Sequence, residues 1–174
     1  MKLKFVSAVA LAAGLLATGV ATATTTNLGA AVVGIPLSFG GYSPTGSFND
    51  IFTFTLPSNG GSGYSVTEFM PLGEFRTLLA TLSLISNPDG IPFNSDDTVL
   101  DTSVMPGGNS LALTWTASPS GSYYLAVGGL SRGSKGGIYN GAISVTAVPE
   151  PETYAMMLAG LSALGFLALR RRNV

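Results

Sequence analysis

Alternation of apolar and polar residues constrains the fold of this chain more than any other feature of its sequence. From residue 48 to residue 56, Phe48, Phe52 and Phe54 fall on one face, and Ile51 is the apolar exception on the other face. A spacing of two is that of a half-buried β-strand, because successive side chains of a strand point to opposite sides. A helix would need apolar residues three or four positions apart. This stretch is therefore predicted to be a strand with one face in a core.

The same pattern recurs along the middle of the chain. Short apolar runs are separated by Gly, Pro, Asn and Ser, and between residues 24 and 147 no helical spacing outcompetes a strand. About eight or nine short strands fit this length, which predicts an all-β fold with a single sandwich domain. The predicted strands lie at residues 35–39, 48–56, 64–69, 77–85, 98–104, 111–115, 123–127 and 143–145.

The N-terminus has the layout of a secretory signal peptide. Lys2 and Lys4 precede an apolar run at residues 5–17, and small residues at Ala21 and Ala23 offer a cleavable position. We expect residues 1–23 to be removed by signal peptidase after transport by the secretion machinery. The alternative is an uncleaved membrane anchor.

The C-terminus also has the composition of a membrane segment. Residues 154–169 carry no charge and are dominated by Ala, Leu, Met and Gly. As a helix they would reach roughly 24 Å, against about 30 Å of bilayer hydrocarbon, so that thinning or snorkelling arginines must supply the rest. Arg170, Arg171 and Arg172 would keep the basic tail, residues 170–174, in the cytoplasm. A short transmembrane helix is therefore predicted.

Two prolines set the conformation just before this apolar segment. Pro149 and Pro151 exclude a regular helix or strand, and each favours extended geometry in the residue before it. Residues 148–153 would then form an extended peptide just outside the membrane, with Glu150 between the prolines. Such a peptide can be recognised by a protease, or it can be a plain prolyl linker to an anchor.

The order of these features resembles a known sorting signal. The sequence Val148-Pro149-Glu150-Pro151, the short apolar span and the three arginines look like the PEP-CTERM signal of Gram-negative bacteria, over residues 148–174. The resemblance implies that exosortase, an integral-membrane cysteine protease, recognises Pro149, Glu150 and Pro151 and processes the protein nearby. It further implies a temporary stay in the inner membrane, followed by delivery to the cell surface or the extracellular matrix.

The middle domain, residues 24–147, is similar to a known small domain as well. Residues 52–56 and 121–127 resemble the bacterial pre-peptidase C-terminal domain, and the similarity extends over residues 46–147. This resemblance implies a jelly-roll-like β-sandwich. Its motifs consist mostly of strand residues, so it supports a fold more than a function.

Asp50 is the unusual residue of its strand. Alternation places its carboxylate on the same face as Phe48 and Phe52, where an unpaired charge is costly. It can accept backbone N–H groups from a neighbouring turn, pair with Arg76, or hold a cation. Phe48, Asp50 and Phe52 also match the FxDxF pattern of a family of PEP-CTERM proteins.

Residues that the chain lacks exclude several chemistries. Without cysteine there are no disulfides and no thiolate metal sites, and the chain can only be the substrate of a cysteine protease. Without histidine there is no Ser-His-Asp triad and no usual zinc ligand. The middle domain has few charges and leans acidic, so nucleic acid is not an expected partner.

Oxygen ligands are densest in one acidic stretch. Asp89, Asp96, Asp97 and Asp101 lie close in sequence and are weak calcium candidates. Their spacing matches neither an EF-hand nor a glycine-rich calcium repeat, and a solvated acidic turn is the favoured explanation. The sequence predicts no cofactor, and calcium is the alternative that it leaves open.

The sequence leaves room for two further activities. A hydrolase built from carboxylates would need a facing pair in a cleft. The candidates are Glu68, Glu74, Asp89, Asp96, Asp97 and Asp101. Sugar binding would use exposed aromatic rings: Trp115 is in phase with core leucines, whereas Tyr124 falls on the outward face and is the better candidate.

The sequence therefore predicts an exported, non-enzymatic surface or matrix protein that exosortase sorts and that is linked to exopolysaccharide or biofilm. The alternative is a polysaccharide- or calcium-binding module, and a carboxylate-based hydrolase is the less favoured third reading.

Overall fold

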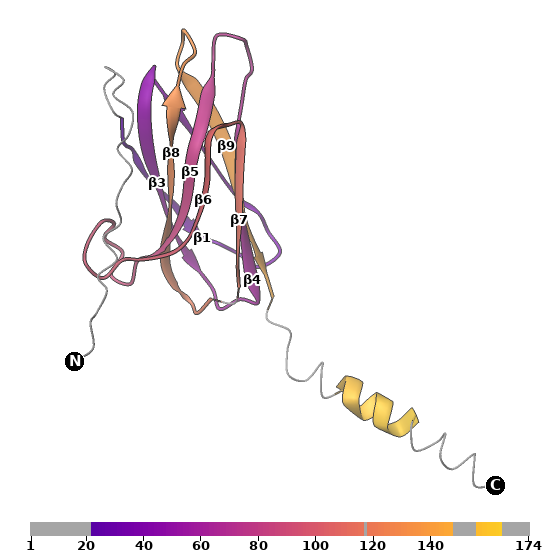
Figure 1. The fold of residues 1–174 in the computed structure, drawn as a ribbon. Helices are drawn as coiled ribbons and strands as arrows, with labels where there is room; N and C mark the ends of the chain where they lie inside the picture. The colour runs from indigo at the N-terminus through magenta and orange to yellow at the C-terminus, as the bar shows by residue number, and fades with distance from the viewer. Residues whose placement is uncertain (1–21, 117, 148–155, 165–174) are drawn as a thin grey trace, which may run out of the picture.

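The computed structural model describes residues 22–116, 118–147 and 156–164. Within these ranges nine strands form two sheets that pack face to face (Figure 1). The five-stranded sheet, in spatial order, comprises β1 (Thr25–Ala30), β3 (Gly46–Leu56), β8 (Gly121–Ser131), β5 (Thr77–Ser86) and β6 (Thr98–Gly108). The four-stranded sheet comprises β2 (Leu37–Ser43), β9 (Gly137–Thr146), β4 (Gly61–Glu68) and β7 (Ser110–Thr116). The predicted all-β sandwich is confirmed.

The strand order is that of a jelly roll. Antiparallel pairs are nested along the chain: β2 with β9, β3 with β8, β4 with β7, and β5 with β6. Such nesting describes one long hairpin, and rolling it up brings β8 against β5 and β9 against β4. Two open sheets result, with edge strands β1 and β6 in one and β2 and β7 in the other.

Strand β1 lies outside the sequence prediction. It runs parallel to β3, with Thr25 opposite Ile51 and Ala30 opposite Thr55. Most of its side chains are exposed, so its sequence shows no alternation of apolar and polar residues. The pairing depends on backbone hydrogen bonds along a sheet edge, which residue type barely reveals.

The main core lies between the two sheets, as alternation predicts. Phe48, Phe52 and Phe54 all face it, together with inward residues of the other strands. A second, smaller cluster lies on the outer face of the five-stranded sheet and contains Ile51, Ile85 and Tyr124. Ile51, the apolar exception in its strand, therefore has an apolar environment of its own.

A segment between β5 and β6 contributes to this second cluster. The ring centroid of Phe93 is 5.7 Å from that of Tyr124, and the Tyr124 hydroxyl donates to Asp97 at 3.0 Å. Tyr124 points outward as alternation predicts, yet it is only 3% exposed. The prediction that Tyr124 contacts a sugar is therefore wrong, because the segment after β5 packs against its ring. Trp115 is half-buried against the main core, as expected.

Parts of both predicted membrane-related segments lie outside the described residues. The signal-peptide prediction falls almost entirely on residues 1–21, which are not described. Of the predicted transmembrane helix, residues 156–164 are helical. Nine helical residues extend about 13.5 Å. Among the helices that the structure describes, none has the length and apolar character needed to cross a bilayer.

Candidate functional site

The sorting segment follows directly on a well-anchored strand. Thr146, the last residue of β9, pairs with Gly61; its hydroxyl donates to the Gly61 carbonyl at 2.9 Å, and its own carbonyl accepts from Gly60 N at 3.0 Å. The predicted recognition residues Pro149, Glu150 and Pro151 lie outside the described residues, as do Arg170, Arg171 and Arg172. The sorting segment therefore begins within a few residues of a strand end that is held by hydrogen bonds.

The FxDxF residues gather around one tyrosine of the opposite sheet. The ring of Phe48 stacks on that of Tyr139 with centroids 5.3 Å apart, and the ring of Phe52 meets it edge-on at 6.3 Å. The Tyr139 hydroxyl donates to Asp50 Oδ2 at 2.5 Å. Two rings and one carboxylate of β3 thus hold a single side chain of β9, which joins the two sheets.

The other carboxylate oxygen of Asp50 binds the start of the described chain. Asp50 Oδ1 accepts from Thr24 N at 3.0 Å and from Thr24 Oγ1 at 2.6 Å. Asp50 is 1% exposed. Of the roles that alternation left open, acceptance of a backbone N–H is the observed one. Pairing with Arg76 is wrong, because the ion pair found within the described residues joins Lys135 to Glu74.

Tyr139 stays protonated in this environment. Burial raises the pKa of the Tyr139 hydroxyl well above its usual range, and the hydrogen bond to Asp50 raises it further. The hydroxyl is therefore a permanent donor to the carboxylate at physiological pH.

Gly41 of β2 makes room for this arrangement. It lies opposite Tyr139 in the sheet, and a Cβ at this position would come within 2.6 Å of Tyr139 Cζ and closer still to its hydroxyl oxygen. The glycine is thus required by the close approach of the ring. Sequence reasoning missed Tyr139 as the partner of Asp50 because 89 residues separate them and only the sheet pairing brings them together.

The acidic candidates for calcium binding do not converge. Asp97 Oδ2 accepts from Phe93 N and from Asn94 N, at 2.6 and 3.2 Å. Asp89 accepts from Ile91 N and Asn94 Nδ2, both within its own turn. Within the described part of the chain, the structure holds no group of three or more acidic side chains that could bind a metal ion. Asp96 is exposed, and Asp101 binds the backbone N–H of Thr102.

The two glutamates weighed as hydrolase candidates have separate structural partners. Glu68 Oε1 accepts from Thr77 N at 2.7 Å, which joins the ends of β4 and β5. Glu74 pairs with Lys135 at 2.6 Å on the surface. Each carboxylate therefore stabilises a loop in this structure.

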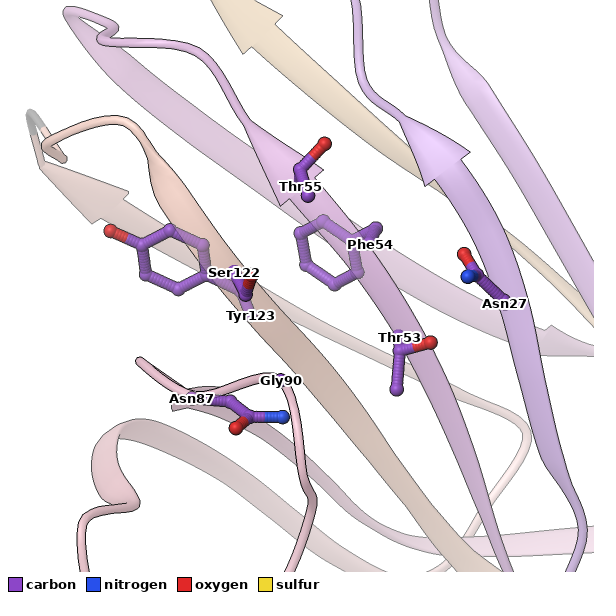
Figure 2. Close-up of a pocket in the computed structure, with 8 residues that line it drawn as sticks. All are labelled: Asn27, Thr53, Phe54, Thr55, Asn87, Gly90, Ser122 and Tyr123. Atoms are coloured by element: carbon purple, nitrogen blue, oxygen red, sulfur yellow. The ribbon is translucent and has the colours of Figure 1, made fainter.

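A small polar notch lies on the outer side of the five-stranded sheet (Figure 2). It has a volume of about 130 Å³. Asn87, which is 1% exposed, extends from its turn toward β3, and both polar atoms of its side-chain amide lack a partner within the described residues. Its lining residues are Asn27, Thr53, Phe54, Thr55, Asn87, Gly90, Ser122 and Tyr123.

Asn87 is not among the site residues that the sequence pattern indicates. An unpartnered, buried amide is uncommon in proteins and marks a place where a polar ligand or water would fit. Asn87 N donates to Ser122 O of β8 at 3.0 Å, and only the folded chain places the amide beside Thr53 of β3.

The tail of the chain matches a known sequence motif. Residues 147–172 match the family model of the PEP-CTERM protein-sorting motif. The chain carries a PEP-CTERM sorting motif. The match includes Pro149, Glu150 and Pro151 and extends to Arg172, so the resemblance seen in the sequence is confirmed for this segment.

No curated protein matches the chain. Among solved structures, the pre-peptidase C-terminal domain of collagenase from Bacillus anthracis is similar, with a TM-score of 0.39, 15% identity, and coverage of 69% of this chain and 94% of that domain. CorA, a surface-associated copper-binding protein of Methylomicrobium album BG8, gives 0.42 at 8% identity, covering 71% of this chain and 99% of CorA. CsCBM6-3 from Clostridium stercorarium, solved with cellobiose, gives 0.30 at 12% identity, covering 64% and 74%.

Proposed function

We propose that this chain is an exported, non-enzymatic surface protein that exosortase sorts through its PEP-CTERM motif. The motif at residues 147–172 is the observation that carries the proposal. A signal peptide at residues 1–23 would start export, and a membrane helix at residues 154–169 would hold the protein until processing. The sandwich would then reach the cell surface or the exopolysaccharide matrix of a Gram-negative bacterium.

The fold suits a substrate of this kind. The sandwich ends at Thr146, and the Pro149-Glu150-Pro151 peptide follows after two residues. A membrane-embedded protease would therefore meet the peptide close to a rigid body, without a long linker. A protein that lacks cysteine also has no disulfides to form before or after export.

Replacement of Pro149-Glu150-Pro151 by three alanines tests recognition. We expect full-length protein to accumulate in the inner membrane, as measured by fractionation and mass spectrometry in cells with and without exosortase. A matched control replaces Pro71-Leu72-Gly73, three exposed residues of the segment between β4 and β5, by alanines and should be processed normally. Normal processing of the Pro149-Glu150-Pro151 variant would show that the proposal is wrong.

The notch supports a second candidate function, binding of a small polar ligand such as a saccharide unit. The unpartnered amide of Asn87 is the observation that favours it. Calorimetric titration of the exported protein with fragments of the matrix polysaccharide, and separately with calcium, tests this function. We expect heat of binding that Asn87→Ala abolishes and that Asn109→Ala, at an exposed turn, leaves unchanged. No heat in any titration would dismiss it.

A further inference from the structure

The buried carboxylate of Asp50 faces the position at which export would cut the chain. Its Oδ1 accepts from the backbone nitrogen of Thr24, and the expected signal-peptide cleavage lies between Ala23 and Thr24. The hydrogen-bonded nitrogen is thus the atom that cleavage would turn into a new N-terminus. A single hydrogen bond therefore connects the expected cleavage site to the buried carboxylate of Asp50.

Cleavage changes the charge of that nitrogen. Hydrolysis of the Ala23–Thr24 amide consumes one water. The carbon–nitrogen bond breaks, the Ala23 carbonyl carbon gains the water oxygen and becomes a carboxylate, and the Thr24 nitrogen gains both protons. At neutral pH the new α-amine, with an ordinary pKa of about 7.7–8.0, is an ammonium. A neutral N–H donor in the precursor becomes a cation in the mature chain.

We propose that removal of the signal peptide creates the cation that Asp50 is positioned to bind, so that the Thr24 α-ammonium and the Asp50 carboxylate form an ion pair in the mature protein. The inference rests on the export step of the proposed function. Asp50 is therefore a binding site for the protein's own processed N-terminus.

The surroundings of Asp50 favour such a pair. A buried carboxylate is costly without a charged partner, and none of the hydrogen bonds to Asp50 in the described chain comes from a Lys or Arg side chain. Thr24 Oγ1 donates to the same oxygen at 2.6 Å, and Tyr139 holds the other oxygen. The ammonium would find a carboxylate already fixed in place. Thr24 itself is exposed, so the remaining ammonium protons can bind water.

In the precursor, residues before the expected cleavage site form hydrogen bonds with β3. In the uncut chain Thr22 pairs with β3: Thr22 N donates to Ser47 O at 3.0 Å, and Asn49 N donates to Thr22 O at 2.9 Å. Cleavage would remove these two neutral backbone bonds and the hydrogen bond of 3.0 Å between the hydroxyls of Thr22 and Ser43, and it would supply one charge pair. Downstream, Ile51 N still donates to Thr24 O at 2.7 Å. The pair would thus hold the first residue of the mature chain at the start of β1.

Anchoring Thr24 would also keep β1 in place along the edge of the five-stranded sheet. Strand β1 covers the edge of β3, and its side chains bury little apolar surface. Without an anchor a short parallel edge strand frays readily, and its loss exposes the backbone of β3. The ion pair would therefore close the edge of the sheet once export is complete.

A double-mutant cycle on the mature chain tests the pair. Residues 24–174 are released in detergent from a removable fusion partner so that Thr24 comes first, and a matched chain keeps Thr22 and Ala23. Each chain is made with the native Asp50 and with Asp50→Asn, and unfolding by denaturant is measured. In the longer chain the ammonium lies two residues away, about 6.6 Å along an extended strand, and its interaction with Asp50 is weaker.

We expect Asp50→Asn to raise the unfolding constant of both chains, and the factor should be roughly ten times larger for the chain that begins at Thr24. A factor of ten corresponds to a shift of about one unit in the pKa of the α-amine. Equal effects in both chains would overturn the proposal. A second readout is the pKa of the Thr24 α-amine by NMR, expected about one unit above its ordinary value in the Asp50 protein. If the Asp50→Asn chains do not fold, this pKa decides, and an ordinary value overturns the pair.

N-terminal sequencing of the exported protein completes the test. Thr24 as the first residue supports the proposal, and any other start overturns it. These outcomes are independent of the Pro149-Glu150-Pro151 experiment, which reports on processing at the opposite end of the chain.

Discussion

Replacing Tyr139 with phenylalanine removes one hydroxyl from the space between the two sheets and changes little else. The ring would keep its stacking on Phe48 and its edge contact with Phe52. Asp50 Oδ2 would lose the hydrogen bond of 2.5 Å that Tyr139 donates. The variant therefore isolates the contribution of one donor to a buried carboxylate.

The size of the effect follows from the burial of both partners. Tyr139 and Asp50 are each 1% exposed, so water cannot easily replace the lost donor. A hydrogen bond to a charged group contributes about 1.5–3 kcal/mol, and an orphaned buried acceptor adds to that loss. We expect Tyr139→Phe to lower the free energy of unfolding by about 3 kcal/mol.

The protein contains a convenient probe for this measurement. Trp115 is the chain's single tryptophan and packs against the main core, so its fluorescence reports unfolding in denaturant. Tyr42→Phe is the matched control, because Tyr42 is 57% exposed and its loss of a hydroxyl should change stability by less than about 0.5 kcal/mol. A loss below about 1 kcal/mol for Tyr139→Phe would refute the reasoning that this donor supports Asp50.

Three further outcomes follow from the same structure. Gly41→Ala should displace the Tyr139 ring and destabilise the fold by about 2 kcal/mol or more, measured by the same fluorescence; an unchanged midpoint would contradict the close approach. Because burial raises the pKa of Tyr64 and Tyr124 to about 12, their contribution to stability should be complete below about pH 10 and fall as the pH rises toward 12. Unfolding midpoints at stepped alkaline pH check this, and a flat profile would disprove it. Asp97→Ala removes the acceptor of the Tyr124 hydroxyl and should lower the free energy of unfolding by about 1–2 kcal/mol. It should also speed amide hydrogen exchange in residues 87–97, and unaltered exchange would show that other contacts hold this segment.

The sandwich could be predicted because its signal is local. Alternation in residues 48–56 states which face of β3 is buried, and the structure places Phe48, Phe52 and Phe54 in the main core accordingly. The same reasoning marked Ile51 as an exception and left it unexplained. Its explanation, a second apolar cluster under the segment after β5, depends on a contact between distant parts of the chain.

The features that sequence reasoning missed share a physical cause. Strand β1 is held by backbone pairing along an edge, and backbone groups are the same in every residue. The partners of Asp50 come from Thr24 and Tyr139, which lie 26 and 89 residues away. Tyr124 has outward parity, yet a loop buries it, and parity alone does not show what covers a face. In each case the decisive contact appears only once the topology is known.

The place of β9 within its sheet affects how the protein withstands tension. The sorting tail continues from this strand, and β9 is flanked by β2 on one side and by β4 on the other. If the proposed membrane segment holds the protein before processing, a pull on the tail would act on two rows of backbone hydrogen bonds at once. Until processing, the proposed anchor would therefore pull on an interior strand of its sheet and not on an edge strand.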